Sequence, residues 1–248
     1  MARQLDPYAL LADVYDRLSR VESKEIAAEY LVRRLKGLHP GRTISVVDLA
    51  CGSGNVTTAL LRHENVTVTA VDTSASMLAI AEAKAQRLNQ AVSFVHSDIR
   101  QLDLATPHDG AVCLSFSLAY LAEKADLLQF IRRLGANIRR GGLFLFDMID
   151  RSALRSDWFD IEAKRWQSVG LSARVEWTDR AAGAYRIEYS RDDLQHGRVF
   201  EHHHGRAYLE SELVTAFTSE SYFTIVPLSA LATSCATPHL RYFLAQRT

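Results

Sequence analysis

A glycine-containing loop between a predicted strand and a predicted helix holds the residues best suited to bind a ligand. The apolar run 44–47 leads into Asp48, and Gly52 and Gly54 stand in the loop. Glycine allows backbone conformations, and a close approach to a ligand, that a Cβ would obstruct. Helix-like sequence resumes at residues 56–62, so the loop amides and the positive helix end would face the ligand. The segment therefore predicts a site for an anion or a nucleotide.

A second acid, Asp72, ends the next predicted strand, 67–72. The loop before it lacks the Gly-Lys-Ser/Thr ending of a phosphate-binding P-loop. It also has Thr57 where a dinucleotide fingerprint has its third glycine. A carboxylate at Asp72 still suits a ribose diol, because it can accept both hydroxyl hydrogens. This combination indicates a nucleoside that carries no pyrophosphate.

Residues 44–148 resemble the core of the class I S-adenosylmethionine-dependent methyltransferases. Arg140 stands where proline often precedes the paired glycines, and Ala50 stands where the commonest pattern has glycine. The resemblance implies S-adenosylmethionine as cofactor and S-adenosylhomocysteine as product. Four motifs carry it, in the order that the family has them: 48–54, 71–77, 97–100 and 141–147.

The resemblance also implies which residues contact the cofactor. Asp72 would bind the ribose, and Asp98 and Ile99 would flank the adenine. The structural alternatives are a helix cap for Asp72, a loop acid for Asp98 and a core position for Ile99. The full set of expected cofactor contacts is Tyr15, Asp48, Ala50, Gly52, Gly54, Asp72, Thr73, Met77, Asp98, Ile99 and Ser115.

Aromatic side chains on three other segments are candidates for the acceptor side of the site. Residues 115–120 follow the fourth strand, where open α/β sheets place ligands. Tyr8 and Tyr15 share a face of the first predicted helix, and the strand-like segment 160–206 follows the fifth strand. Core packing is the alternative for the tyrosines, and a dimer interface or a solvated sheet is the alternative for 160–206. The expected substrate contacts are Tyr8, Phe116, Tyr120, Trp166, Trp177 and Tyr189.

Three consecutive histidines, at positions 202–204, raise the question of a metal or a general base. In a strand His202 and His204 share one face and His203 points away, so at most two could bind one ion. No spacing suggests a third ligand, and we predict no metal. The candidate catalytic residues are Tyr120, His202 and His204, with packed or solvated histidines as the alternative. An amine acceptor needs only to lose one proton, so the sequence leaves the catalytic residue unassigned.

Composition narrows the class of protein. A chain of 248 residues with 48% apolar residues can bury a substantial core in one α/β domain. A formal net charge of zero argues against a broad basic surface for nucleic acid. Three widely spaced cysteines without a C-x-x-C pair are typical of reduced thiols. No apolar run approaches the roughly 20 residues of a membrane span. We expect a cytoplasmic monomer or homodimer with no membrane or nucleic-acid partner.

Strand and helix patterns alternate from residue 44 to residue 149, which implies right-handed crossovers and a parallel sheet. The fold class is therefore α/β, and the resemblance implies a doubly wound, seven-stranded mixed sheet with the last strand antiparallel. Asp6 and Pro7 predict a first helix from their position to about Arg20. We predict one domain, 1–248, with a helical lid at 1–40, a cofactor-binding core at 44–149, an inserted antiparallel sheet at 160–206, and a helix with the last strands at 208–248.

The flanking segments refine the expected function. Residues 8–18 and 204–224 resemble small-molecule methyltransferases, including sugar N,N-dimethyltransferases of antibiotic pathways. The expected reaction is methyl transfer to a nitrogen or oxygen of a small metabolite, in secondary metabolism. A methyltransferase acting on protein or nucleic acid is one alternative, although residues 115–118 lack the Asn/Asp-Pro-Pro-aromatic motif. A cyclase or scaffold that keeps the cofactor is the other. The sequence does not specify the acceptor atom, the number of methyl groups or the oligomeric state.

Overall fold

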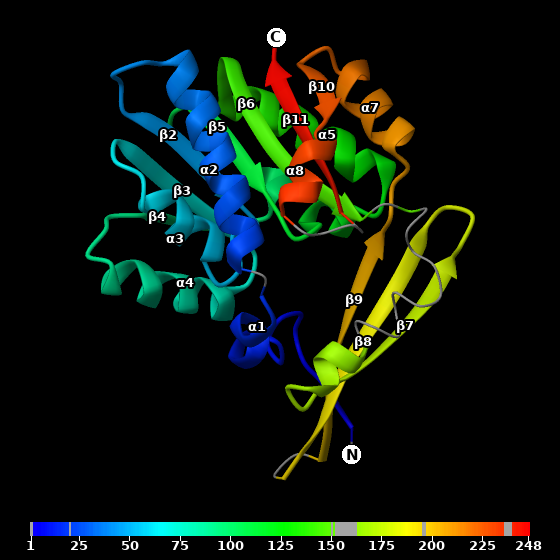
Figure 1. The fold of residues 1–248 in the computed structure, drawn as a ribbon. Helices are drawn as coiled ribbons and strands as arrows, with labels where there is room; N and C mark the ends of the chain where they lie inside the picture. Colours follow the sequence, from blue (N-terminus) through cyan, green and yellow to red (C-terminus); the bar gives the residue numbers. More distant parts are fainter. Residues whose placement is uncertain (1, 20, 150, 152–162, 195–196, 236–239) are drawn as a thin grey trace.

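The computed structural model describes residues 2–19, 21–149, 151, 163–194, 197–235 and 240–248. Its larger sheet has seven strands in the order β10-β11-β6-β5-β2-β3-β4 (Figure 1). Only β11 runs against its neighbours, pairing antiparallel with β6 and β10. This confirms the predicted seven-stranded mixed sheet. The strands are β2 (Ile44–Leu49), β3 (Val66–Asp72), β4 (Ser93–His96), β5 (His108–Cys113), β6 (Ile138–Ile149), β10 (Phe223–Pro227) and β11 (Leu240–Arg247).

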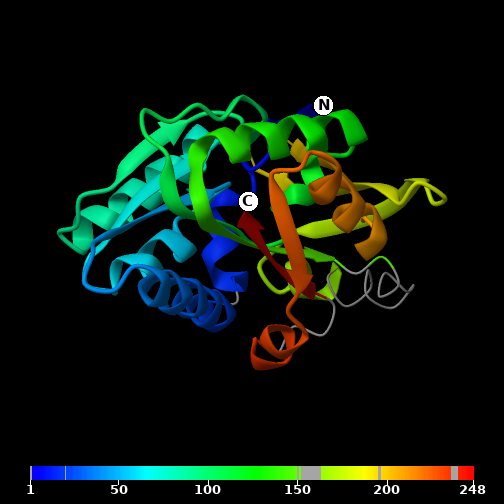
Figure 2. The ribbon, with the colours of Figure 1, turned by 90° about the horizontal axis from the view of Figure 1, so that it is seen from above.

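Helices cover both faces of this sheet, as Figure 2 shows from above. On one face α2 (Val21–Leu38), α3 (Asn55–Leu61) and α8 (Ser229–Ser234) pack in one apolar cluster. On the other face α5 (Lys124–Asn137) and α7 (Glu210–Ser219) pack in a second cluster. All six residues of the central strand β5 are buried, as expected of a parallel strand covered on both sides. Two further helices are α1 (Ala12–Leu18) and α4 (Ala75–Arg87).

A second sheet has four strands in the order β1-β9-β8-β7. It contains β7 (Ser172–Asp179), β8 (Ala184–Asp193) and β9 (Gly197–Arg206), which pair antiparallel as predicted. The two-residue strand β1 (Arg3–Gln4), which the sequence did not predict, joins β9 in parallel. In Figure 1 this sheet and α1 lie beyond the carboxyl ends of the parallel strands, where α/β sheets bind ligands. Residues 160–162 and 195–196 of the predicted insertion lie outside the described residues.

The prediction of a first helix beginning at Asp6 was wrong, since α1 begins at Ala12. Tyr8 adopts a left-handed backbone with φ 66°, which a continuous helix does not allow. The amide N–H groups of Tyr8 and Leu10 instead donate to the Glu201 carboxylate, at 3.2 and 2.7 Å. A partner on β9 therefore outweighs the local capping signal. No helix among the described residues is long and apolar enough to cross a membrane.

Candidate active site

The glycine loop after β2 turns through three left-handed residues. Ala50, Gly52 and Gly54 have φ values of 53, 53 and 79°. A Cβ on Gly54 would lie 2.8 Å from the Cβ of Ala81 on α4, so the helix packing itself requires glycine there. A Cβ on Gly52 would meet nothing within 4 Å. Gly52 is therefore the position that leaves open space for a ligand, whereas Gly54 lets α4 approach the loop.

Asp72 connects this loop to the end of β3. Its Oδ2 accepts the Gly52 N–H at 2.7 Å, and its Oδ1 accepts the Ser74 N–H at 2.8 Å. Burial raises the pKa of Asp72, and the backbone N–H groups of Ser74 and Gly52 act in the opposite direction. Each carboxylate oxygen retains acceptor capacity. The carboxylate is thus held in place with room to accept the two hydroxyls of a ribose.

Two further carboxylates are buried near the carboxyl ends of core strands. Asp48 is 1% exposed and accepts the Thr57 hydroxyl at 2.6 Å. Asp147 is 2% exposed and accepts the N–H groups of Ser115 and Phe116, at 3.0 and 2.5 Å. Burial raises the pKa of Asp48 to about 7 and that of Asp147 to about 6.

Together, Asp48, Asp72 and Asp147 form an acidic cradle, and this name is used for these three residues below. A positive charge from Lys24 favours the ionised forms of Asp48 and Asp147 but does not offset their burial. Buried carboxylates with raised pKa values gain free energy when a cation binds beside them. The cradle therefore suits a ligand that carries positive charge.

The other expected cofactor contacts lie at the ends of β3 and β4. Asp98 begins the short 3₁₀ turn η1 (Ile99–Gln101). Its carboxylate pairs with Arg100 at 2.6 Å, and the hydrogen bond from Arg100 lowers its pKa. Ile99 is 8% exposed, and Met77 in the first turn of α4 is fully buried. The Thr73 carbonyl is 2.8 Å from the His96 ring nitrogen Nε2.

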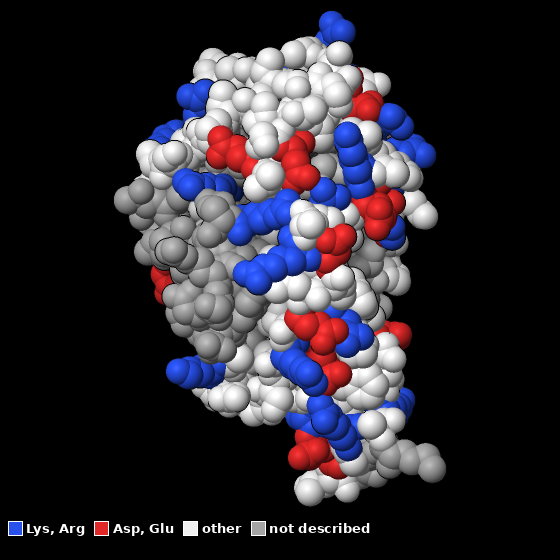
Figure 3. Space-filling model, turned by 90° about the vertical axis from the view of Figure 1, so that its right-hand side faces the viewer, with Lys and Arg blue, Asp and Glu red and all other residues white. Residues whose placement is uncertain are grey.

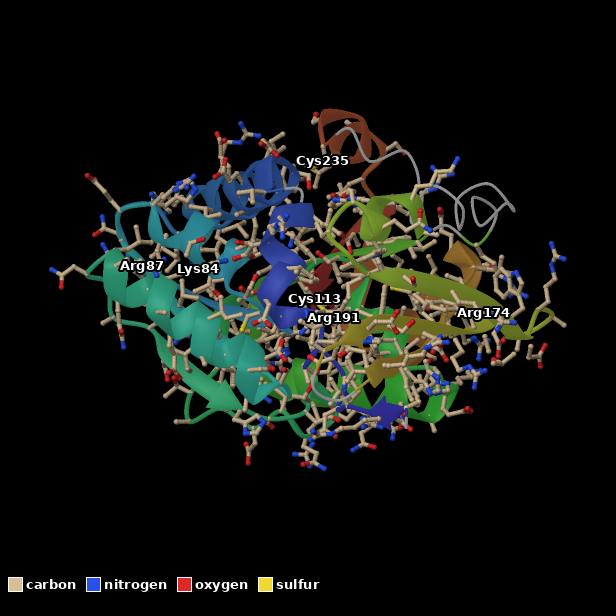
Figure 4. The ribbon with its side chains drawn as sticks, turned by 90° about the horizontal axis from the view of Figure 1, so that it is seen from below. Lys84, Arg87, Cys113, Arg174, Arg191 and Cys235 are labelled. Atoms are coloured by element: carbon tan, nitrogen blue, oxygen red, sulfur yellow. The ribbon has the colours of Figure 1, made fainter. Side chains whose placement is uncertain are left out.

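The amino-terminal helix α1 is attached directly to the glycine loop. Asp16 accepts the Ser53 hydroxyl at 2.6 Å and the Asn55 side-chain amide at 3.0 Å. It also forms an ion pair with Lys84 of α4 at 2.6 Å. Figure 4 shows Lys84 on the side of α4 that faces the amino-terminal helices. These contacts hold α1, and with it Tyr15, beside the loop. The sequence reasoning did not identify Asp16.

A cavity lies between the amino-terminal segment, the loop after β5 and the second sheet. It has the character of an aromatic box, with the rings of Trp166 and Tyr189 in edge contact at 4.8 Å. Seven residues expected to touch the cofactor or the acceptor line it, namely Tyr8, Tyr15, Ser115, Phe116, Tyr120, Trp166 and Tyr189. Of the candidate catalytic residues, His204 also lines it.

Of the residues expected to contact the acceptor or to act in catalysis, two have other surroundings and are absent from the described cavity wall. The ring of Trp177 packs at the edge of Tyr185, with a centroid distance of 6.4 Å. His202 lies 3.1 Å from a carboxylate oxygen of Glu188. The structure therefore does not bring Trp177 and His202 together with the other candidates.

A hydrogen-bond chain in the cavity wall, buried at its inner end, contains two residues that sequence reasoning missed. Tyr8 Oη is 2.8 Å from Tyr120 Oη, and Tyr120 Oη is 2.6 Å from His203 Nδ1. His203 Nε2 is 2.8 Å from Glu201 Oε1. His203 is 2% exposed and Glu201 is fully buried. The usable signal was the period of two in β9, which places 201 and 203 on one face.

The two tyrosines of this hydrogen-bond chain, Tyr8 and Tyr120, stay neutral. Desolvation raises the pKa of Tyr8 well above its usual value, and the neighbouring Tyr15 adds to the effect. Desolvation and then the Tyr8 hydroxyl raise the pKa of Tyr120 in the same way. Tyr120 is 40% exposed, but it lines the cavity. The negative charge of Asp72 also raises the pKa of Tyr8, so the cradle and the cavity share one electrostatic environment.

Among the described residues, no group of three or more histidine, cysteine, aspartate or glutamate side chains is placed to hold a metal ion. The groups that the described site offers to a ligand are carboxylates, backbone amides, hydroxyls and aromatic rings.

Comparison with known proteins gives consistent results. A family model described as a methyltransferase domain matches residues 46–142. The dTDP-3-amino-3,6-dideoxy-α-D-glucopyranose N,N-dimethyltransferase of Streptomyces fradiae is 29% identical over 245 residues, covering 91% of this chain and 86% of that protein. The dTDP-4-amino-2,3,4,6-tetradeoxy-D-glucose N,N-dimethyltransferase of Saccharopolyspora spinosa is 29% identical over 139 residues, or 55% of this chain. The alignment covers 53% of the length of the Saccharopolyspora spinosa protein and 57% of the length of another relative, so the chain spans about half the length of these two relatives.

A solved structure of an S-adenosylmethionine-dependent methyltransferase from Clostridium acetobutylicum has the same fold. It superposes with a TM-score of 0.75 at 21% identity and covers 97% of this chain and 98% of its own. The matched residues include the glycine loop, Asp48 and Asp72, whereas Asp147 of the cradle lies beyond their end. Residues 46–142 therefore form a methyltransferase domain, and the chain as a whole has the fold of the S-adenosylmethionine-dependent methyltransferases.

Proposed function

We propose that this protein transfers the methyl group of S-adenosylmethionine to an amine nitrogen of a small metabolite of the amino-sugar class. The observation that carries the proposal is the position of an aromatic, hydroxyl-lined cavity next to an acidic cradle and an open glycine loop. The relative from Streptomyces fradiae, which aligns over most of both chains, is named for methylation of a sugar amine.

The residues present fit this cofactor. When bound, S-adenosylmethionine supplies a methyl group on a positively charged sulfur, already activated for displacement. Asp72 would accept the ribose hydroxyls, Asp98 and Ile99 would flank the adenine, and Gly52 would admit the ligand close to the backbone. The acidic cradle would favour the cationic cofactor because burial raises the pKa values of its carboxylates in spite of their hydrogen bonds.

The cavity fits an amine that carries hydroxyl groups. Aromatic faces attract ammonium groups, with a strength of about 0.5–2 kcal/mol. The residues that line the cavity include Tyr8, Tyr120, Trp166 and Tyr189. Tyrosine hydroxyls can also donate to and accept from sugar hydroxyls. The contribution of these residues would be to align the nitrogen with the carbon–sulfur bond and to exclude water.

Charge distribution favours a metabolite over a nucleic acid. On the face shown in Figure 3, basic and acidic side chains are interspersed rather than separated into a basic area. The whole chain has equal numbers of basic and acidic residues, 29 each. Nucleic-acid binding depends on a basic stripe or patch that releases counterions from phosphates.

The test is incubation of the purified protein with S-adenosylmethionine and a panel of acceptors, with quantification of S-adenosylhomocysteine and the methylated product. We expect turnover with nucleotide-linked amino sugars, and none with the matched sugar that has a hydroxyl in place of the amine. Turnover only with protein or nucleic acid would contradict the proposal. Cofactor binding by calorimetry without turnover on any acceptor would indicate a cyclase or scaffold instead.

We further propose a cytoplasmic protein that is a monomer or a homodimer. Its three cysteines, Cys51, Cys113 and Cys235, are all buried and none forms a disulfide, as expected in a reducing compartment. Light scattering coupled to size-exclusion chromatography would measure the oligomeric state.

A further inference from the structure

We propose that Tyr8, Tyr120 and His203 form a proton relay that carries a proton away from the acceptor amine, with Glu201 positioning the imidazole at its inner end. The relay rests on the proposed function, because it needs an amine bound in the cavity. It also assigns a role to His203 and Glu201, which no cofactor contact requires.

The direction of the hydrogen bonds follows from the inner end of the chain. The Oε1 atom of Glu201 accepts the Tyr8 N–H, and its Oε2 atom accepts the Leu10 N–H. A carboxylate has no hydrogen to donate, so His203 Nε2, at 2.8 Å from Oε1, must be the donor. A neutral imidazole with its hydrogen on Nε2 has an acceptor at Nδ1.

The outer end follows from this tautomer. Tyr120 lies 2.6 Å from His203 Nδ1 and must donate its hydroxyl hydrogen there. The Tyr120 oxygen then accepts the hydroxyl hydrogen of Tyr8, 2.8 Å away. This leaves the lone pairs of the Tyr8 oxygen as the free acceptor of the chain, and Tyr8 lines the cavity. The relay thus presents an acceptor, not a donor, to an ammonium group.

The proton balance of the step is complete without another reactant. The acceptor ammonium gives one proton to the Tyr8 oxygen, Tyr8 passes its own to Tyr120, and Tyr120 passes its own to His203 Nδ1. The resulting imidazolium lies 2.8 Å from the Glu201 carboxylate. The freed nitrogen lone pair forms the nitrogen–carbon bond as the electron pair of the carbon–sulfur bond moves to sulfur. The product leaves as a protonated methylamine, and His203 returns its proton to water.

The surroundings of Tyr8 and Tyr120 favour passing a proton through their hydroxyls over leaving a negative charge on either phenol oxygen. Desolvation keeps both Tyr8 and Tyr120 neutral by raising their pKa values, so each hydroxyl can accept and donate at once. The rings of Tyr8 and Tyr189 pack on His203 at 4.8 and 5.1 Å. The titratable and charged groups that face His203 or line its cavity are Tyr8, Tyr120, Tyr189, Glu201, Lys24, Asp147, Arg165, His204, Tyr15, Tyr185 and Tyr242.

The kinetic test compares Tyr120→Phe and His203→Gln with wild type across pH. We expect both variants to lose about 100-fold in kcat at pH 7, the range typical of general acid–base catalysis. The loss should shrink as pH rises, because the amine then arrives already deprotonated and no relay is needed. Below the pKa of the amine, the variant rate should rise about tenfold per pH unit. Wild type should depend on pH less steeply.

Matched controls are Tyr222→Phe and His63→Gln, which make the same chemical changes outside the cavity wall. Affinity for S-adenosylmethionine, measured by calorimetry, should be unchanged in all four variants. If His203→Gln fails to fold, Tyr120→Phe still tests the relay, since it removes a single oxygen. Variant losses that are constant with pH, or full activity in Tyr120→Phe, would overturn the relay.

A readout independent of turnover is the tautomer of His203. Nitrogen-15 spectra, recorded where the ring is neutral, should show the hydrogen on Nε2 in the cofactor-free protein. A hydrogen on Nδ1 would overturn the relay, because that atom could not accept from Tyr120. If wild type methylates no amine, the proposed function fails first, and the tautomer still reports on the hydrogen-bond chain.

Discussion

The two halves of the site are built in different ways. The cofactor half is the glycine loop with the acidic cradle, which we propose binds the cofactor. In it, Gly52 and Asp72 are separated by 20 positions and joined by a hydrogen bond from the Gly52 backbone N–H. The acceptor half is the cavity, which we propose binds the amine; in it, Tyr8 and Glu201 are separated by 193 positions, and each wall comes from a different element. Local strand–loop geometry therefore shapes the cofactor half, whereas tertiary packing assembles the acceptor half.

The halves also differ in charge. The cradle holds three buried carboxylates whose pKa values are raised by burial. The cavity wall holds tyrosines whose pKa values are also raised, which keeps them neutral. The cradle therefore gains from a bound cation, while the cavity orients neutral or ammonium groups by hydrogen bonds and ring faces. Substitutions of residues that belong to one half only, such as Gly52 or Trp166, should leave the function of the other half intact.

The largest expected effect is the loss of both stability and cofactor binding in Gly54→Val, and Gly52→Ala is the variant to compare with it. Any Cβ at Gly54 lies 2.8 Å from the Cβ of Ala81 in a backbone of φ 79°, so Gly54→Val should destabilise the fold and lose cofactor binding together. Gly52→Ala faces open space and should cost about 1–2 kcal/mol of backbone strain. It should still weaken binding. Thermal unfolding and calorimetry separate the two outcomes, and a stable Gly54→Val protein would refute the packing role.

The next effect is expected from Asp72→Ala. The ribose contact is the same before and after transfer, so the variant should bind S-adenosylmethionine and S-adenosylhomocysteine about 10- to 100-fold more weakly. Both affinities should fall by the same factor. Asp103→Ala, which removes an exposed acid of the same domain, is the control in calorimetry. Unchanged affinity in Asp72→Ala would remove the ribose assignment.

A smaller effect, confined to the acceptor half, is expected from Trp166→Ala. Trp166 lines the cavity and contacts Tyr189, so its loss should lower kcat/KM about 10-fold or more by widening the acceptor site. Affinity for the cofactor should not change. Trp177→Ala is the comparison, because the structure pairs Trp177 with Tyr185 instead, and its effect should be smaller. Equal losses in both variants would mean that Trp166 acts only through packing and does not contact the acceptor.

The contrast between the halves also explains how much the sequence could predict. The order of strands and helices from residue 44 to residue 149 follows from local apolar patterns, as in the run Ile44–Val47 of β2. The start of α1 does not, because the left-handed backbone of Tyr8 depends on Glu201. No local signal near Tyr8 encodes that distant partner.

The histidines of β9 show the same limit. The period of two correctly separates His203 from His202 and His204. Periodicity alone does not say which face turns inward, since both faces of β9 carry polar residues. The distance of 2.6 Å between His203 Nδ1 and Tyr120 Oη shows that the face of β9 with His203 turns inward. A catalytic role for Tyr120, His202 or His204 stays a prediction, which Tyr120→Phe tests for Tyr120.

The smallest effect concerns pH and the acidic cradle. Burial raises the pKa of Asp48 to about 7, above the value of about 3.9 in an unfolded chain. A bound cation favours the ionised carboxylate, so affinity for S-adenosylmethionine should rise as pH rises through 7 and then level off. We expect a gain of about tenfold between pH 6 and pH 8. Calorimetry in buffers of different ionisation enthalpy should show proton release on binding.

The same carboxylate makes the opposite prediction for the free protein. Between about pH 4 and pH 7 the unfolded chain has released the Asp48 proton and the folded chain has not, so the free energy of unfolding should fall as pH rises. Asp48→Asn should reduce both the rise in affinity and the fall in stability, because the amide does not titrate and can still accept from Thr57. Because the pKa of Asp147 is raised to about 6, the free energy of unfolding of Asp48→Asn should still fall with pH, but less steeply. A stability profile identical in wild type and Asp48→Asn would show that the pKa of Asp48 is not raised in the folded protein, and the rise in cofactor affinity through pH 7 could then not come from Asp48.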